Sequence, residues 1–313
     1  MSGGGWRDAP GGPGAVRTEL LQVTAADGVV LHGLLQEPER PRAAVLMMHG
    51  NSSSFYQPFF TYFAERMLAT GWTTLRANNR GHDVVSRGDA PGSASPRYLG
   101  AAFERVDECR YDWSAWLDYL AQGDRAPLVV WGHSLGAVKT AYYLARSDDR
   151  RVAAAVLASP PRLAHSLLTA HTAHAEAIRR QLEEARLLVA SGRPDALVSV
   201  TLPTPFLCSA ATYLDKYGPE EPYDVVRLLD QVEIPVLVLT GEREVAQDLP
   251  FIGLPAAIEE LRRRRPRLAH VSIPDADHHY TGRQPFALSR VMEWLEGLGL
   301  TTADAPIHYN PLP

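Results

Sequence analysis

Leu128-Val129-Val130-Trp131-Gly132-His133-Ser134-Leu135-Gly136 is the stretch of this 313-residue chain that decides the fold. Its four leading apolar residues predict a strand buried on both faces, as in a parallel sheet. Residues 138–146, beyond the second glycine, have helical spacing. A Gly-x-Ser-x-Gly turn between a buried strand and a helix exposes its serine hydroxyl, and glycines leave room for the sharp bend. The sequence therefore predicts Ser134 as a nucleophile.

Strand-like and helix-like segments alternate on both sides of this motif. Strands are expected at residues 29–35, 43–48, 72–77, 152–158, 235–240 and 268–273, and helices at 59–68, 106–120, 256–264 and 285–298. Strands that alternate with helices imply right-handed βαβ crossovers. The chain is therefore expected to be an α/β protein with a mainly parallel sheet.

Residues 161–231 interrupt the alternation with a long helical stretch at 173–190 and a loop at 202–205. We expect this mostly helical insertion to form a lid over the carboxyl edge of the sheet, where ligands bind in open α/β sheets. The core is then expected over residues 18–160 and 232–300. A flexible leader is expected at 1–17, and an irregular tail at 301–313.

Composition excludes several classes of protein. Hydrophobic residues make up 45% of the chain and charged residues 21%, which is typical of a globular protein. The formal net charge of −5 argues against a nucleic-acid partner. The chain shows no signal peptide and no run of about 18 apolar residues, so a cytoplasmic location without a membrane partner is expected. The oligomeric state is open, a homodimer included.

The two cysteines, Cys109 and Cys208, are isolated from each other and from histidines. This arrangement indicates neither a disulfide framework nor a metal site. We therefore expect no metal and no other cofactor. The arginine run at residues 262–265 lies beside glutamates in a helical pattern, which predicts a solvated helix face.

A serine hydroxyl needs a base within hydrogen-bond reach and a third group that orients the base. When the serine follows such a strand, the chain order is serine, acid, histidine. The candidate base is His278, which follows the last predicted strand and the pair Ala276-Asp277. The next residue, His279, is the alternative.

The acid should follow the preceding strand, where three carboxylates lie close together in the sequence. Glu244 is the preferred candidate because it occupies the fourth place of a Gly-x-x-acid turn that begins at Gly241. Asp248 and Glu242 remain alternatives. Glutamate is one methylene longer than aspartate but can still hold an imidazole in the required tautomer.

Acyl transfer also needs donors for the tetrahedral oxyanion. The backbone N–H of Leu135, at the start of the helix after the serine, is one candidate. The loop His49-Gly50-Asn51, which follows an apolar strand, offers the N–H of Asn51 as the second.

Aromatic residues in the insertion and after the oxyanion loop are candidates for a substrate pocket. We expect Tyr213, Phe55 and His133 to contact the substrate, although aromatic residues of the insertion could simply pack it onto the sheet. Few basic residues accompany them, which favours a neutral, fairly apolar acyl group or ester. Further candidates are Phe206, Leu207, Tyr217, Tyr223, Tyr56, Phe59 and Phe60.

The chain resembles the α/β-hydrolase superfamily over residues 18–300. The resemblance is carried, in the family's order, by His49-Gly50-Asn51, Asn79-Arg80-Gly81-His82, Gly132-His133-Ser134-Leu135-Gly136, Gly241-Glu242-Arg243-Glu244 and Ala276-Asp277-His278. It implies an α/β-hydrolase fold with an eight-stranded sheet, helices on both faces and a helical cap. The segment 209–218 looks like esterase-like hydrolases of bacteria and fungi. Glu244 stands where the family usually has aspartate.

The resemblance implies a serine hydrolase that cleaves a carboxylic ester through Ser134, Glu244 and His278. It does not imply one substrate, because this fold hosts many chemistries. An acyltransferase, cyclase or thioesterase could use the same three residues, and a binding protein could retain the fold without turnover. Arg80-Gly81-His82 is expected to be structural.

Overall fold

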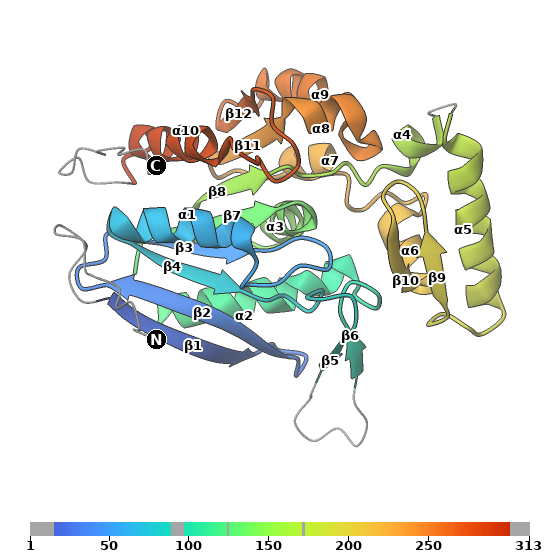
Figure 1. Ribbon diagram of the computed structural model, residues 1–313, viewed down its shortest axis with the longest axis horizontal. Helices are drawn as coiled ribbons and strands as arrows, with labels where there is room; N and C mark the ends of the chain where they lie inside the picture. The colour runs from blue at the N-terminus through green and yellow to red at the C-terminus, as the bar shows by residue number, and fades with distance from the viewer. Residues whose placement is uncertain (1–15, 89–96, 124, 171–172, 301–313) are drawn as a thin grey trace, which may run out of the picture.

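The computed structural model describes residues 16–88, 97–123, 125–170 and 173–300. Eight strands form one sheet in the order β1-β2-β4-β3-β7-β8-β11-β12 (Figure 1). Their bounds are β1 Val16–Thr24, β2 Val30–Pro38, β3 Ala43–Met48, β4 Trp72–Ala77, β7 Leu128–His133, β8 Val152–Ala158, β11 Val236–Gly241 and β12 Leu268–Ile273. Within this sheet, the described pairs β1–β2 and β2–β4 are antiparallel and the others are parallel. The predicted mainly parallel, eight-stranded sheet is confirmed.

Helices cover both faces of the sheet. On one face α1 (Pro58–Ala69) and α10 (Gln284–Gly297) share an apolar cluster with Val45 and Trp131. On the other face α2 (Cys109–Ala121), α3 (Leu135–Arg146), α7 (Val225–Leu229) and α9 (Leu254–Arg262) share a cluster with Leu46 and Val130. Successive residues of β3 and β7 thus point to opposite cores, which explains why both strands are apolar without alternation. Burying one such side chain contributes about 1.5–3 kcal/mol.

The first strand differs from expectation. β1 starts at Val16, two residues before the expected start of the core, and pairs with β2 along its length. Its residues are mostly exposed or half-buried because it lies at the sheet edge. An edge strand has no continuous apolar run, so β1 was not predicted from the residue pattern. The rest of the expected leader, and the expected tail at 301–313, lie outside the described residues.

An insertion follows β8 and precedes β11. It contains α4 (His165–Ala170), α5 (Ala175–Ala190), β9 (Leu197–Val200), β10 (Phe206–Ser209), α6 (Ala210–Tyr217) and α7. The antiparallel hairpin β9–β10 was not expected, because its two strands have only four residues each. In the insertion, α4, α5, α6 and the hairpin β9–β10 stand beyond the ends toward which the parallel strands point (Figure 1), whereas α7 packs on the core beside α3. Active-site loops collect at that edge in parallel sheets.

Three shorter segments complete the core. β5 (Ser86–Gly88) and β6 (Arg97–Leu99) form a second hairpin, η1 (Val106–Glu108) leads into α2, and α8 (Glu242–Gln247) with η2 (Leu249–Phe251) follows β11. Among the described helices, none combines the length and apolar character required to cross a bilayer.

Arg80 anchors the loop after β4. Its guanidinium is fully buried and pairs with Asp112 at 2.7 Å, Asp27 at 2.7 Å and Glu108 at 2.9 Å. The next histidine, His82, lies 2.8 Å from the carboxylate of Asp83. A buried charge with three carboxylate partners holds a loop in one conformation, which is consistent with a structural role for this segment.

Candidate active site

The turn that carries Ser134 is strained and tightly packed. Ser134 lies between β7 and α3 with φ of 56° and ψ of −128°. A non-glycine residue in such a conformation costs about 1–3 kcal/mol, and such strain is common at functional sites. A Cβ at position 132 would lie 2.4 Å from the carbonyl oxygen of Gly136, and one at position 136 would lie 2.3 Å from that of Met48. Both positions therefore require glycine.

His278 and Glu244 meet at the carboxyl edge of the sheet. His278, in the loop after β12, places Nδ1 2.8 Å from Oε2 of Glu244. The carboxylate is fully buried, whereas the imidazole is 27% exposed. The other oxygen, Oε1, accepts hydrogen bonds from the backbone N–H of Gly241 at 2.6 Å and from the Ser159 hydroxyl at 2.7 Å. Three donors thus fix the orientation of this carboxylate.

The two alternative acids lie elsewhere. Glu242 is exposed and accepts the backbone N–H of Asp275 at 3.2 Å. Asp248 follows α8, and no hydrogen bond joins it to His278 in the described part of the chain. A Cβ at position 241 would lie 2.5 Å from the carbonyl oxygen of Ala276, so glycine there lets the two loops pack together.

His133, within the serine motif, supports the loop of His278. Its Nε2 donates to the carbonyl oxygen of His278 at 2.9 Å, and its ring stacks on Phe59 with centroids 3.9 Å apart. Burial, together with the neighbouring His278, lowers the pKa of His133 well below its ordinary value. The ring is therefore neutral at pH 7. His279, the alternative base, is exposed, and no hydrogen bond joins it to Glu244 within the described residues.

The predicted oxyanion loop touches the serine. A Cβ at position 50 would lie 2.7 Å from Cβ of Ser134, so the backbone at Gly50 passes directly beside the nucleophile. Asn51 follows it, and Leu135 begins α3. Within the described ranges, neither the Asn51 nor the Leu135 backbone N–H donates a hydrogen bond to another residue. Both amides are available to an oxygen bound near Ser134.

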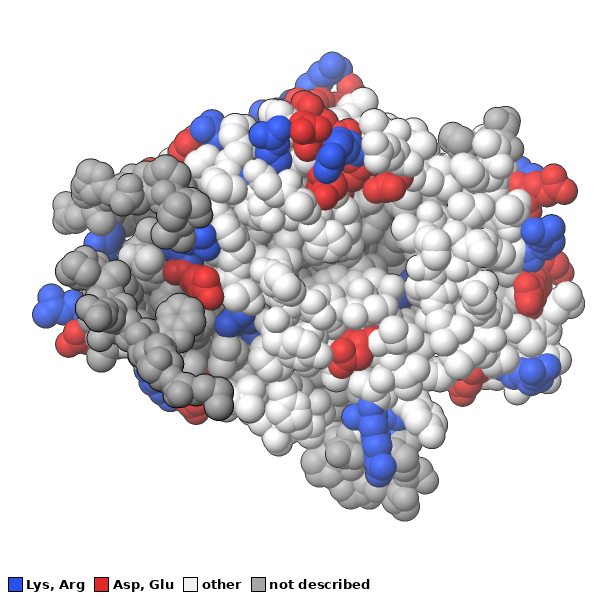
Figure 2. All heavy atoms as spheres, viewed as in Figure 1, with Lys and Arg blue, Asp and Glu red and all other residues white. Residues whose placement is uncertain are grey.

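A cavity of about 520 Å³ opens onto Ser134, His278 and Asn51. Figure 2 shows the corresponding face hollowed between the sheet and the insertion, with a largely uncharged surface around the hollow. Aromatic and polar residues complete its lining: Phe59, Tyr62, Phe206, His133, His279, Ser53, Gln57, Thr204, Thr281 and Gln284. Among the described residues that line it, none is a lysine, arginine, aspartate or glutamate.

Two residues expected to contact the substrate do not line this cavity. Tyr213 is fully buried inside the insertion, and its hydroxyl donates to the carbonyl oxygen of Leu202 at 3.2 Å. Phe55 is not among the lining residues, and its backbone N–H donates to Oδ1 of Asn78 at 2.9 Å. Phe59 and Phe206 supply the aromatic surface instead. Helical spacing indicates that an aromatic residue is buried, but not against which partner.

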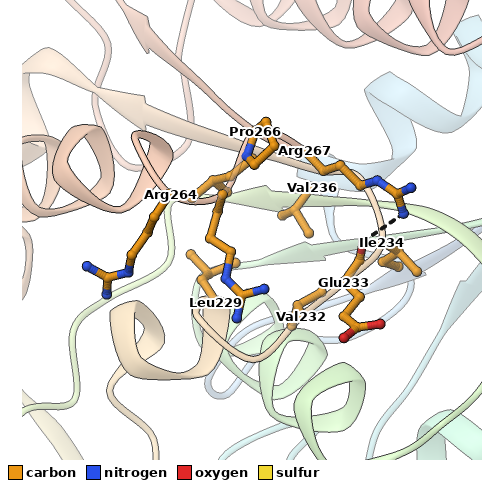
Figure 3. A pocket seen from close by; sticks show the side chains of 10 residues that line it. Leu229, Val232, Glu233, Ile234, Val236, Arg264, Pro266 and Arg267 are labelled. Atoms are coloured by element: carbon orange, nitrogen blue, oxygen red, sulfur yellow. Dashed lines mark hydrogen bonds between the residues drawn. The ribbon is translucent and has the colours of Figure 1, made fainter.

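A second cavity, of about 330 Å³, lies before β11 and β12, at the opposite end of these strands from Ser134 (Figure 3). Its arginines have partners: Arg264 pairs with Asp230 at 3.1 Å, and Arg267 donates to the carbonyl oxygen of Glu233 at 3.1 Å. Among its described lining residues, Glu233 is the one carboxylate, and none is a serine, cysteine or histidine. Across the described residues, no group of three or more His, Cys, Asp or Glu side chains is arranged to hold a metal ion.

A buried charge cluster, not predicted from the sequence, lies behind the oxyanion loop. Lys216 of α6 donates to Oδ1 of Asn51 at 3.0 Å and to Oε1 of Glu104 at 3.0 Å. Lys139 of α3 also pairs with Glu104 and donates to Asn79 at 2.7 Å. Lysine in the buried face of a helix is the signal that could have revealed the cluster.

Comparison with known proteins supports the fold. The model of the alpha/beta hydrolase family matches residues 45–291. No curated protein matches the chain. Three similar solved structures are an esterase of Pyrococcus furiosus, Est1E of Butyrivibrio proteoclasticus with ferulic acid bound, and the alpha/beta hydrolase GrgF of a Penicillium species.

These structures share the fold at low sequence identity. The Pyrococcus esterase is 18% identical, with a TM-score of 0.59 over 90% of this chain and 91% of its own. Est1E is 17% identical, with a TM-score of 0.62 over 88% of this chain and 98% of its own. GrgF is 16% identical, with a TM-score of 0.65 over 90% of this chain and 98% of its own. The family match spans most of the sheet and the strained serine turn, so the chain belongs to the alpha/beta hydrolase family.

Proposed function

We propose that this protein hydrolyses a carboxylic ester through an acyl-enzyme formed on Ser134. The observation that carries the proposal is the 2.8 Å hydrogen bond between His278 and the buried Glu244, in a loop that borders the same cavity as Ser134. A serine in a strained turn, a base and an orienting acid are the three parts that nucleophilic acyl transfer needs.

The proposed first half-reaction forms the acyl-enzyme. Ser134 Oγ attacks the ester carbonyl carbon while His278 Nε2 takes the hydroxyl proton. Glu244 holds Nδ1–H and stabilises the imidazolium. Among the described residues, no hydrogen bond joins Ser134 Oγ to His278, and such bonds often tighten only when substrate binds. The tetrahedral intermediate then collapses, and His278 gives its proton to the departing alkoxide, which leaves as the alcohol.

The second half-reaction returns the enzyme to its starting state. Water attacks the acyl carbon and loses a proton to His278. The second tetrahedral intermediate releases the carboxylic acid, and Ser134 Oγ regains its proton. In both halves the carbonyl oxygen becomes an oxyanion, for which we assign the backbone N–H groups of Leu135 and Asn51 as donors.

The proposed substrate is a neutral ester with an apolar or aromatic acyl group. The cavity lining is free of lysine, arginine and carboxylates, so a charged acyl group would lose its hydration without gaining an ion pair. Phe59, Tyr62 and Phe206 offer aromatic surface. Est1E, which shares the fold, binds ferulic acid, an aromatic acid. We also propose that residues 161–231 act as a cap, since Thr204, Pro205 and Phe206 of the insertion line the cavity.

A labelling experiment tests the proposal. The protein is incubated with a fluorophosphonate probe and, separately, with p-nitrophenyl esters of increasing chain length, alongside Ser134→Ala. We expect the wild type to be labelled and to release p-nitrophenol, and Ser134→Ala to do neither. Labelling that persists in Ser134→Ala would exclude this nucleophile. Labelling without hydrolysis of any ester would favour an acyltransferase, cyclase or thioesterase. The absence of any labelling would favour a binding protein.

A further inference from the structure

We infer that Lys216 is a positioning residue: from the insertion, it holds the oxyanion loop through the side chain of Asn51 and places a positive charge behind that loop. The inference rests on the proposed function, because it assigns a task to the insertion in the reaction of Ser134. Lys216 does not line the cavity. Its effect on the reaction would therefore pass through Asn51 and through the field of its charge.

The contacts of Lys216 explain how its ammonium group can be buried. The side chain is 2% exposed. Nζ donates to Asn51 Oδ1 and to Glu104 Oε1, each at 3.0 Å, and lies 5.3 Å from the ring centroid of Phe206. A buried lysine is costly unless its donors and charge are satisfied. Two hydrogen bonds and an aromatic face meet that need, so the ammonium is fixed in one place.

The cluster around Lys216 carries an excess of positive charge. Burial alone would raise the pKa of Glu104, but the charges of Lys139 and Lys216 lower it to about 2, so this carboxylate is ionised at neutral pH. Burial lowers the pKa of His49 to about 3, so that imidazole is neutral. Two ammonium groups therefore face one carboxylate. A net positive charge in a dry site stabilises a nearby oxyanion.

The oxyanion loop is held at both ends by this cluster. On the core side, Asn79 donates its backbone N–H to His49 Nε2 at 3.3 Å and its side-chain Nδ2 to the His49 carbonyl oxygen at 3.1 Å. On the other side, Lys216 holds Asn51. The amide proposed to bind the oxyanion lies at Asn51, so the insertion controls the end of the loop that matters for the reaction.

Such a role predicts a particular kinetic pattern. The charge on the carbonyl oxygen develops only on the way to the tetrahedral intermediate, so a misplaced donor lowers kcat without weakening substrate binding. Loss of Lys216 should therefore reduce kcat while KM changes little. A residue that only stabilised the fold would lower the melting temperature and leave both constants of the folded enzyme unchanged.

Lys216→Met is the variant that tests the inference. Methionine keeps much of the apolar stem, and Glu104 retains Lys139 as its partner, so no buried charge is left unpaired. The matched control is Asp215→Asn, one residue away on α6. Asp215 also links the insertion to the core, through the backbone N–H of Val106 at 2.9 Å. Within the insertion it accepts from the hydroxyl of Tyr223 at 3.0 Å, and no hydrogen bond joins it to Asn51 among the described residues.

The readouts are steady-state hydrolysis of the best p-nitrophenyl ester, the rate of fluorophosphonate labelling, and the melting temperature. We expect Lys216→Met to lower kcat and the labelling rate together by about 10- to 100-fold, with KM within about twofold of wild type. Asp215→Asn should stay within about threefold of wild type in kcat, in KM and in the labelling rate. The inference would be overturned if Lys216→Met were labelled at the wild-type rate. It would also be overturned if Asp215→Asn lost as much kcat as Lys216→Met.

Asn51→Ala provides a second test that does not depend on the folding of Lys216→Met. It removes the acceptor Oδ1 and keeps the backbone N–H. We expect Asn51→Ala to lose activity, but no more than Lys216→Met, because the ammonium charge remains, and we expect the double variant to lose no more than Lys216→Met. Wild-type labelling of Asn51→Ala, or losses that multiply in the double variant, contradict the inference. Failure of the proposed function is distinct, because then the wild type itself is not labelled at Ser134.

Discussion

Glu244 accepts a hydrogen bond of 2.8 Å from Nδ1 of His278, and its carboxylate is fully buried. The bond fixes the proton of the imidazole on Nδ1, since a carboxylate accepts and an N–H donates. The opposite nitrogen, Nε2, is then left with a lone pair for a hydroxyl proton. This is the tautomer that a base for Ser134 needs.

Glu244→Gln is expected to lower kcat by about 10³- to 10⁴-fold, because an amide can donate to Nδ1 and so favour the wrong tautomer. The measurement is steady-state hydrolysis of a p-nitrophenyl ester, with circular dichroism as the check on folding.

The matched controls are Glu242→Gln and Asp248→Asn, which change the two neighbouring acids. Each is expected to stay within about threefold of wild type, since neither carboxylate bonds to His278 in the described residues. A loss in either control as large as that in Glu244→Gln would mean that the acid is misassigned.

Ser159→Ala tests the support of Glu244. The Ser159 hydroxyl lies 2.7 Å from Oε1 of Glu244 and 2.9 Å from the hydroxyl of Tyr280, so its removal leaves a buried carboxylate with one donor fewer. We expect kcat to fall by about 10-fold and the unfolding free energy by about 1–3 kcal/mol. Chemical denaturation and steady-state kinetics measure the two effects. Unchanged kcat would show that Gly241 and His278 alone hold the carboxylate.

Gly50→Ala is expected to remove activity out of proportion to stability. The new Cβ would lie 2.7 Å from Cβ and 3.2 Å from Oγ of Ser134, so it would displace either the nucleophile or the oxyanion loop. A misplacement of about 1 Å can cost about 100-fold in rate. Gly297→Ala is the control, because nothing lies within 4 Å of a Cβ there. Full activity in Gly50→Ala would contradict the tight contact between loop and serine.

The sequence predicted the parts of the fold that depend on local pattern. Central strands such as β7 are short apolar runs, because both faces are buried, and the helices that follow them have regular spacing. β1 escaped detection because only pairing with β2 stabilises it, and its exposed positions carry polar residues. Hairpin β9–β10 escaped for the same reason: pairing between two four-residue strands is not visible in either one.

In the candidate site, too, the residues that follow predicted strands could be predicted, and those brought together by packing could not. Ser134, Glu244 and His278 each follow a predicted strand, so their meeting could be inferred from the rule that parallel strands end at one edge. Lys216 and Lys139 lie on two different helices and Glu104 on a loop, and the three are far apart in the sequence. Their contact depends on how the insertion packs on the core, which no local pattern records. For the same reason, the sequence did not predict that Tyr213 is buried inside the insertion and does not line the cavity.

Substrate charge provides a further prediction. An ester with a neutral acyl group is expected to have kcat/KM at least about 10-fold higher than the matched ester whose acyl chain ends in a carboxylate, because the cavity offers no cation as a partner. The pair is compared at equal chain length and at one ionic strength. Gln57→Lys, at the cavity lining, is expected to narrow the difference. A preference of the wild type for the anionic ester would contradict the neutral cavity.

Stability should fall as the pH is lowered below about 6.5, because His49 is buried in its neutral form. Burial lowers its pKa in the folded protein to about 3, and Lys139 and His82 act in the same direction, whereas Glu104 and the hydrogen bond to Gly50 oppose them. Below its ordinary pKa of 6.5 the unfolded chain therefore binds a proton that the folded protein does not. The free energy of unfolding should decline by up to about 1.4 kcal/mol per pH unit from this one residue.

Glu104 extends the loss to lower pH. Its folded pKa of about 2 lies below its ordinary value of 4.5, so its contribution is complete above 4.5 and disappears as the pH falls towards 2. Urea unfolding between pH 7 and pH 5 isolates the histidine effect. His49→Gln, which can still accept from Asn79 and donate to Gly50, should have a shallower slope there, whereas His32→Gln, at an exposed position on β2, should keep the wild-type slope. An unchanged slope in His49→Gln would mean that His49 gains a proton in the folded protein as easily as in the unfolded chain, and the cluster behind the oxyanion loop would then carry a further positive charge at mildly acidic pH.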